Sequence, residues 1–268
     1  MHPAQLSTPF SRMGARLRLG ELRPTDVRAR NQPLTLDVRS DVAGEFFDIR
    51  LHSGARLELD VVDLRRRDRH LLLRAQEERG SHFFLCGHDE QHWFVAGVPG
   101  SDLTSVAAAM EALKPPEVVE AQRRQGVKGK DRQRRKNAAY VRQGEWFFLP
   151  VPKLRVDKNQ VLCNEPLSRG AGSKPHWAQF LYRKGGEVVY VCDAHPQGLT
   201  PQSYHDLLRR TPRAKTWAWR QMVRNPEACV KGAVSHPDHK TIVLQVWHRV
   251  LMNTEGQSQA MRHVVFLD

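Results

Sequence analysis

The sequence lacks the features that would tie it to a membrane, a disulfide scaffold or a zinc ribbon. No run approaches the roughly 18 apolar residues of a membrane span, and no apolar secretion segment follows the start. The four cysteines are far apart and form no C-x-x-C pair, which argues against a zinc ribbon or a dense disulfide framework. We therefore expect a cytoplasmic protein whose thiols are buried and inert, namely Cys86, Cys163, Cys192 and Cys229.

Acidic residues are scarce relative to basic ones. The chain holds 42 Lys and Arg against 29 Asp and Glu, a net charge of +13. Such a field concentrates polyanions near the surface, and nucleic acid is the commonest of them. Anionic lipid, ribosomal surfaces and acidic proteins are alternatives, and high charge also serves solubility alone. The 268 residues, 40% of them apolar, suffice for two domains with real cores.

Acids are absent from the first 20 residues, which carry Arg12, Arg16 and Arg18 among Ser and Thr. This composition suits either a mitochondrial presequence or a plain basic arm. Pro3 and Pro9 are expected to interrupt any early helix. We favour the arm, and predict that residues 1–30 form a flexible basic extension.

Within residues 31–116, the segments 34–38, 47–51 and 57–61 alternate apolar and polar side chains, as strands with one wet face do, and three further segments also favour strands. The pattern predicts strands at residues 34–38, 47–51, 57–61, 70–75, 82–86 and 92–96, with a hairpin turn at Ser53-Gly54. Short spacings indicate antiparallel neighbours. A helix capped at Ser101-Asp102 and stopped by Pro115-Pro116 is expected to close this meander.

Residues 117–142 form a basic segment that we interpret as a linker. Between Arg123 and Arg142 nine side chains are cationic, and Asp131 is the only acid. Each duplex phosphate that such a side chain neutralises releases counterion, so binding would weaken steeply with salt. The segment is alternatively a solvated connector or a polybasic address. The candidate nucleic-acid contacts are Arg123, Arg124, Lys128, Lys130, Arg132, Arg134, Arg135, Lys136 and Arg142.

Residues 143–268 mix strand and helix patterns. Strands are predicted at 145–149, 177–182, 188–192, 229–234, 241–251 and 263–267, with a Gly185-Gly186 hairpin. One helix is expected after Thr200-Pro201, and a second through Trp217, Trp219 and Met222. The fold class is thus α+β: an antiparallel β-rich N-terminal domain and an α+β C-terminal domain joined by a basic linker.

Two histidine clusters are candidates for chemistry. His88 and His92 are four residues apart, but Gly87 and flanking strands indicate a hairpin turn rather than the helix that a zinc-hydrolase motif needs. The second cluster, in the turn 235–240, suits proton transfer or metal binding, and His176 and His195 would join it if the sheet brings their loops together. Its candidate catalytic residues are His236, Asp238, His239 and His248.

Three hypotheses follow. The first is a protein that binds DNA or RNA through the basic segment. The second is a histidine-dependent, possibly metal-dependent enzyme that hydrolyses or modifies nucleic acid at the second cluster. The third is an adaptor for an acidic protein partner. The sequence identifies no cofactor, and it favours the first hypothesis because the basic segment is its densest feature.

Overall fold

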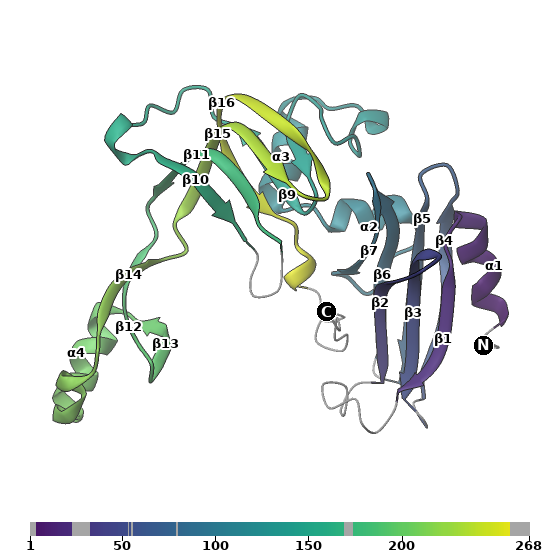
Figure 1. Ribbon diagram of the computed structural model, residues 1–268, viewed down its shortest axis with the longest axis horizontal. Coiled ribbons are helices and arrows are strands. Elements are labelled where there is room, and N and C mark those ends of the chain that lie inside the picture. Colours follow the sequence, from purple (N-terminus) through teal and green to yellow (C-terminus); the bar gives the residue numbers. More distant parts are fainter. Residues whose placement is uncertain are drawn as a thin grey trace.

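The computed structural model describes residues 4–22, 33–52, 54, 56–78, 80–168 and 174–257. About 21% of the chain is helix and 51% strand, so the fold is mixed and rich in strands. Figure 1 shows two neighbouring sheets formed by the first hundred residues, a larger sheet beside them, and a small lobe that projects from the far end of the larger sheet. The division into two domains with a linker stays a prediction.

The N-terminal strands form two sheets that face each other across one core. A three-stranded sheet has the order β1-β3-β2, built from Leu17–Leu22, Gly44–His52 and Leu34–Asp41. A four-stranded meander follows in chain order, β4 to β7. Phe47 of the first sheet and Phe84 of the second are buried in the same cluster. The meander strands are Glu58–Arg65, His70–Glu77, Gly80–Asp89 and His92–Val98.

The six predicted N-terminal strands are present, but their pairing differs from the expected meander. Strand β1 pairs with β3 in parallel. The predicted hairpin at Ser53-Gly54 is wrong, because β3 and β4 on either side of it belong to different sheets; Ser53 itself lies outside the described residues. A glycine signals a change of chain direction but does not determine which strand the chain then pairs with.

The expectation of a flexible arm over residues 1–30 is contradicted for residues 4–22. Helix α1 (Ala4–Met13) and strand β1 occupy this stretch. Leu6, Phe10 and Met13 form one apolar stripe of α1, and all three are buried in the core. Burying them stabilises the fold by roughly 1.5–3 kcal/mol each, which offsets the cost of about 3 kcal/mol for Pro9 inside the helix.

Helix α2 (Val106–Ala112) is capped by Ser105 rather than Ser101-Asp102, because the Ser105 hydroxyl accepts the Ala108 N–H.

The basic segment 117–142 is folded onto its surroundings. Helix α3 (Pro116–Arg124) and a short 3-10 turn, η2 (Gly129–Asp131), follow. Val118 of α3 and Tyr140 are buried against Phe147, so both ends of the segment are anchored.

A six-stranded antiparallel sheet carries most of the second half. Its order is β10-β11-β15-β16-β9-β8, and the 3-10 turns η3 (Lys158–Gln160) and η5 (Glu255–Gln257) precede β10 and follow β16. Its core contains Phe148, Leu181 and Val234. The predicted strand at 145–149 is confirmed as β9. In sheet order the strands are Leu162–Leu167, His176–Lys184, Glu227–His236, His239–Met252, Trp146–Pro150 and Val141–Gln143.

A projecting lobe separates β11 from β15 along the chain. It contains the sheet β13-β12-β14 (His195–Leu199, Glu187–Cys192, Arg220–Arg224), helix α4 (Pro201–Arg210) and a 3-10 turn, η4 (Pro212–Thr216). The Thr200 cap of α4 is confirmed. The Gly185-Gly186 hairpin is wrong, because β11 and β12 lie in different sheets.

The predicted helix through Trp217, Trp219 and Met222 is also wrong. This stretch leads from η4 into strand β14. The two tryptophans are two residues apart, which is the period of an extended chain and puts both rings on one side. The predicted strand at 263–267 lies outside the described residues.

The cysteines carry no disulfide, and Cys86, Cys192 and Cys229 are buried as expected. Cys163 is exposed, contrary to the expectation, because it lies on the edge strand β10. Among the described residues, the longest helices have only ten residues, and none is long and apolar enough to cross a membrane.

Candidate metal centre

Three histidines converge where three neighbouring strands end. His236 ends β15 and His239 begins β16, and the two form the last pair of this hairpin. His176 begins β11, and the next residue, Trp177, pairs with Ser235 of β15. Because paired residues on adjacent strands bring their Cβ atoms within about 5 Å, the sheet itself places the three imidazoles together.

The geometry of these imidazoles suits a single ion. One ring nitrogen from each of His176, His236 and His239 lies within 4.8 Å of the other two. The ring of His176 is stacked on that of His236 at 4.2 Å between centroids, and the three planes are inclined by only 24–30°. To bind one ion, the three side chains would have to rotate until a nitrogen of each lies at the Zn–N distance of about 2.0–2.1 Å.

His176 is fully buried, and neither of its ring nitrogens has a hydrogen-bond partner. The edge of Trp146 closes the other side of the ring, 6.3 Å away between centroids. A buried imidazole without partners costs free energy, because both nitrogens have lost water. An ion bound by the cluster would satisfy one of them.

Burial also keeps these imidazoles neutral. It lowers the pKa of His176 to about 3, with a further contribution from the neighbouring His236 and His239. Burial is likewise the largest cause that lowers the pKa of His236 and of His239. Neutral rings keep a free lone pair, which is the form that binds a metal ion.

The loop between β8 and β9 covers the nitrogen edge of the cluster. Gly144 lies in this loop with φ +55°, and a Cβ built there would come 2.9 Å from Nε2 of His239 and 3.4 Å from Nε2 of His176. The neighbouring Gln143 is buried and donates from its side-chain amide to the carbonyl of Lys240 at 2.8 Å. The loop therefore leaves space at these nitrogens that only glycine preserves.

Carboxylates surround the cluster. Glu90 Oε2 accepts the backbone N–H of Lys240 at 2.7 Å and lies 3.6 Å from Nδ1 of His239. Asp238, between His236 and His239 in the chain, forms an ion pair with Lys174 at 2.9 Å. An acid behind a ligating imidazole fixes its orientation and raises its basicity.

Two contacts already occupy His236. Its Nδ1 accepts the Asp238 N–H at 3.1 Å, and its Nε2 lies 3.3 Å from the carbonyl oxygen of Lys174. One of these nitrogens would exchange its contact for the ion. The longer contact, to Lys174, is the weaker of the two.

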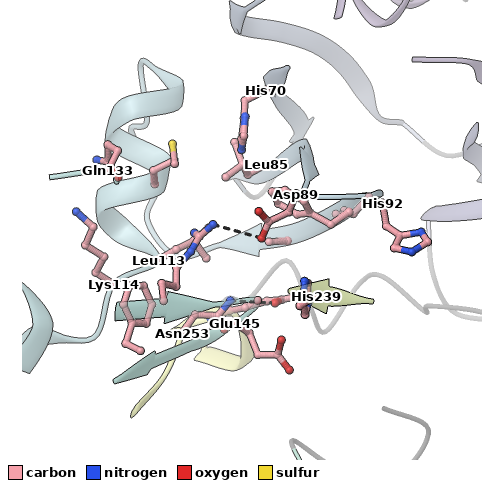
Figure 2. A pocket seen from close by; sticks show the side chains of 18 of the residues that line it. His70, Leu85, Asp89, His92, Leu113, Lys114, Gln133, Glu145, His239 and Asn253 are labelled. Carbon is pink, nitrogen blue, oxygen red and sulfur yellow. Dashed lines mark hydrogen bonds and ion pairs between the residues drawn. The ribbon is translucent and has the colours of Figure 1, made fainter. Parts of the chain in front are cut away.

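The cluster borders a cavity of about 300 Å³ between the N-terminal meander and the six-stranded sheet. Figure 2 shows this cavity, with Asp89 and His92 from the β6–β7 hairpin, and with Glu145 and His239 from the elements of the larger sheet. Glu145 is half-buried; its backbone carbonyl accepts the Asn253 N–H at 2.9 Å, and its carboxylate has no hydrogen bond or ion pair within the described residues. Its carboxylate is therefore available to a molecule in the cavity.

Comparisons of the chain with family models, with curated proteins and with solved structures gave no match. The interpretation of the site therefore rests on its geometry.

The candidate catalytic residues fall in two places. His236, Asp238 and His239 lie at the cluster. His248 pairs with Val230, which lies six residues before His236 along β15, a distance of about 20 Å at strand spacing. Its Nδ1 lies 2.8 Å from the carbonyl oxygen of Val246. His195 stacks on Trp219 in the lobe instead of joining the cluster.

The two sequence clusters lie against each other. His88 and His92 occupy the β6–β7 hairpin predicted for them, and they do not converge. His92 instead lies 2.7 Å from Glu45 through Nδ1 and 3.9 Å from Asp238 through Nε2. Gly144, Glu90 and Glu145 belong to the site without any sequence signal, since no motif connects them to the turn 235–240.

Most of the candidate nucleic-acid contacts are paired within the chain. Six of the nine form ion pairs with acids of this chain. Lys128, Lys130 and Lys136 are exposed and have no carboxylate partner in the described ranges. The paired residues are Arg123, Arg124, Arg132, Arg134, Arg135 and Arg142, so the cationic surface of this segment is smaller than its sequence predicts.

Proposed function

We propose that the protein is a zinc-dependent hydrolase of nucleic acid, with the ion bound by His176, His236 and His239. The observation that supports this most strongly is His176, a buried imidazole whose nitrogens face two others and lack any partner. Three neutral imidazoles suit zinc. Three protein ligands also leave a fourth position for water, which is the pattern of catalytic rather than structural zinc sites.

The residues around the cavity support hydrolysis. An ion at the cluster would lower the pKa of a bound water and so supply hydroxide at neutral pH. Glu145, unpaired and beside His239 at the cavity, is placed to accept the proton of that water. For each phosphodiester cleaved, the water oxygen bonds to phosphorus, the P–O bond to the leaving sugar oxygen breaks, and that oxygen takes the proton from Glu145.

The choice of nucleic acid as substrate is supported by charge. The net charge of +13 draws polyanions toward the protein. Arg142 lines the cavity and contacts only Asp89 among the described acids, at 3.4 Å. A guanidinium there suits one phosphate of a bound strand.

The test combines metal content with turnover. The purified chain should bind one zinc ion and cleave a fluorogenic oligonucleotide. His176→Ala and His239→Ala should lose both properties, while Glu145→Gln should keep zinc and lose about 10²–10⁴-fold in turnover. The exposed His205→Ala serves as control and should change neither. A chain that binds no zinc, or a zinc-loaded chain that cleaves no phosphodiester, would refute the proposal.

Binding of nucleic acid without reaction is the second candidate function. It is supported by Lys128, Lys130 and Lys136, which are exposed and unpaired in the part of the chain that the structure describes. Under this alternative, the native chain binds the oligonucleotide without cleaving it, and His239→Ala binds it with the same affinity.

A further inference from the structure

The lobe, residues 185–226, has little core of its own. Only Val189, Cys192 and Ala214 are buried in it. Figure 1 shows α4 and the three strands of the lobe projecting from the far end of the six-stranded sheet. A projection with so few buried side chains adds little to the stability of the body. Most of its side chains are therefore free to contact another molecule.

Besides the exposed His205, which contacts Tyr204, five aromatic rings are gathered in the lobe. Tyr190 stacks on Tyr204 at 4.0 Å between centroids, and Tyr204 meets the ring of Trp219 edge-on at 4.9 Å. His195 lies 5.8 Å from both Trp217 and Trp219. All five rings are only partly buried. They form a continuous set of π-faces, part of which is open to solvent.

Unpaired cations lie close to these rings along the chain. Arg209 and Arg224 form ion pairs with Asp206 and Glu187. Four further cations of the lobe are exposed and have no carboxylate partner among the described residues: Arg210, Arg213, Lys215 and Arg220. They run from the end of α4 through η4 to β14, on either side of Trp217 and Trp219 in the chain. The basic segment 117–142, by contrast, offers three unpaired lysines and no exposed aromatic ring.

We propose that this face of the lobe binds single-stranded nucleic acid. Unpaired bases would stack on Trp217 and its aromatic neighbours, and phosphates would contact Arg210, Arg213, Lys215 and Arg220. Base stacking on an aromatic ring and phosphate contacts along a cationic surface are how proteins bind single strands. A duplex cannot use the rings in this way, because its bases are already stacked and paired.

This inference deepens the proposed function by naming the form of the substrate, and it rests on that function only for what happens after binding.

Four phosphate contacts to a single strand give a slope of about −2.8 in log K against log salt. The affinity should therefore fall about 50-fold between about 50 and 200 mM salt.

The experiment measures fluorescence anisotropy of a labelled 20-nucleotide oligo-dT and of a 20-base-pair duplex with the full chain in chelator. The native protein should bind oligo-dT more tightly than duplex. The double variant Arg213→Gln/Lys215→Gln should raise Kd about tenfold and lower the salt slope by about 1.4. Trp217→Ala should raise Kd by about 5–150-fold. In the native chain, oligo-dT should also quench tryptophan fluorescence.

The matched control is Lys153→Gln/Lys158→Gln, which removes the same charge from two exposed lysines outside the lobe and outside the segment 117–142, and it should change Kd less than twofold. Because binding is measured in chelator, it does not depend on the metal centre, so a failed metal centre and a failed lobe surface are distinguishable. The proposal is overturned if duplex binds as tightly as oligo-dT, or if the control loses as much affinity as the lobe variant. Equal competition by polyglutamate would overturn it in favour of an acidic protein partner.

Discussion

At the residue scale, His176 has the environment that most needs an explanation. Its ring is fully buried, its nitrogens have no partner, and two other imidazoles lie against it. Gly144 keeps the space beside these nitrogens open. If an ion occupies that space, substitution of either residue should weaken its binding, because His176 supplies a ligand and Gly144 leaves room for the ion.

Gly144→Ala should abolish zinc binding. The added methyl would lie 2.9 Å from Nε2 of His239, where the ion is expected, and the residue would also be strained at φ +55°. Titration of the metal-free variant with Co²⁺, followed by its visible absorption, measures the effect. Gly129→Ala, whose Cβ would meet no atom within 4 Å, is the control. Native affinity in the Gly144 variant would contradict the proposed location of the ion.

His248 should make the protein less stable in acid. Burial lowers the pKa of His248 below the value of about 6.5 expected in the unfolded chain. Below about pH 6.5 the unfolded chain binds a proton at His248 that the folded chain does not bind. The free energy of unfolding therefore decreases as the pH falls from about 6.5 toward the pKa of the folded state. The decrease is at most about 1.4 kcal/mol per pH unit.

Urea unfolding at pH 7.5, 6.5 and 5.5, with chelator present, measures this loss. His248→Gln should be less stable at pH 7.5 but should lose less on acidification than the native chain. The exposed His205→Gln should keep the native pH dependence. An identical pH dependence in His248→Gln would show that His248 is protonated equally in both states.

At the element scale, strands were predictable and their partners were not. Alternation of apolar and polar residues identified β2, β3 and β4, whose Leu36, Ile49 and Leu59 lie in one core. Strands β5 and β6 are buried on both faces, because alternate residues of each lie in two different cores. The dipeptides Ser53-Gly54 and Gly185-Gly186 suggested hairpins, yet the strands they connect enter different sheets. Turn chemistry acts over four residues, whereas sheet pairing is decided by packing across the whole core.

The same limit applies to the site. The turn 235–240 was identifiable from its histidines, and the hairpin that carries it is confirmed as β15–β16. His176 could be named only as a residue that might join the turn, because the register of β11 against β15 is not visible in the sequence. Glu145 and Gly144 had no signal at all.

Helix α1 should contribute substantially to stability, contrary to the flexible arm expected from its basic composition. Phe10 is fully buried and packs edge-on against Phe47, 5.1 Å away between centroids. Phe10→Ala should therefore cost about 3–5 kcal/mol of unfolding free energy. Chemical denaturation measures this cost, and Ser11→Ala, on the exposed face, should cost less than about 0.5 kcal/mol. Equal free energies of unfolding for Phe10→Ala and Ser11→Ala would support a flexible N-terminal arm instead.

At the scale of the whole molecule, the two halves meet at the candidate centre. Glu90, from the meander, forms an ion pair with Arg135 of the basic segment and accepts the N–H of Lys240 beside His239. Arg142 reaches back from the larger sheet to Asp89. Arg135 and Arg142 thus connect the basic segment to the meander through ion pairs. Other arginines of the segment pair with its own acids, Glu120 and Asp131.

Glu90→Gln should weaken zinc binding without removing a ligand. The carboxylate lies 3.6 Å behind Nδ1 of His239, where it would orient the ring and raise its basicity. Zinc affinity should fall about 10–100-fold, measured by competition with a chromophoric chelator. Glu78→Gln, an exposed carboxylate paired with Arg56 far from the site, should retain native affinity. Unchanged affinity in Glu90→Gln would show that this acid has only a structural role.

The central claim is that one ion is held by three imidazoles where β11, β15 and β16 end. X-ray absorption at the zinc edge of the zinc-loaded chain tests it most directly. The account predicts one zinc per chain, with three imidazole nitrogens and one further light atom at about 2.0–2.1 Å. A sulfur shell near 2.3 Å, or the same imidazole signal in His176→Ala, would contradict it.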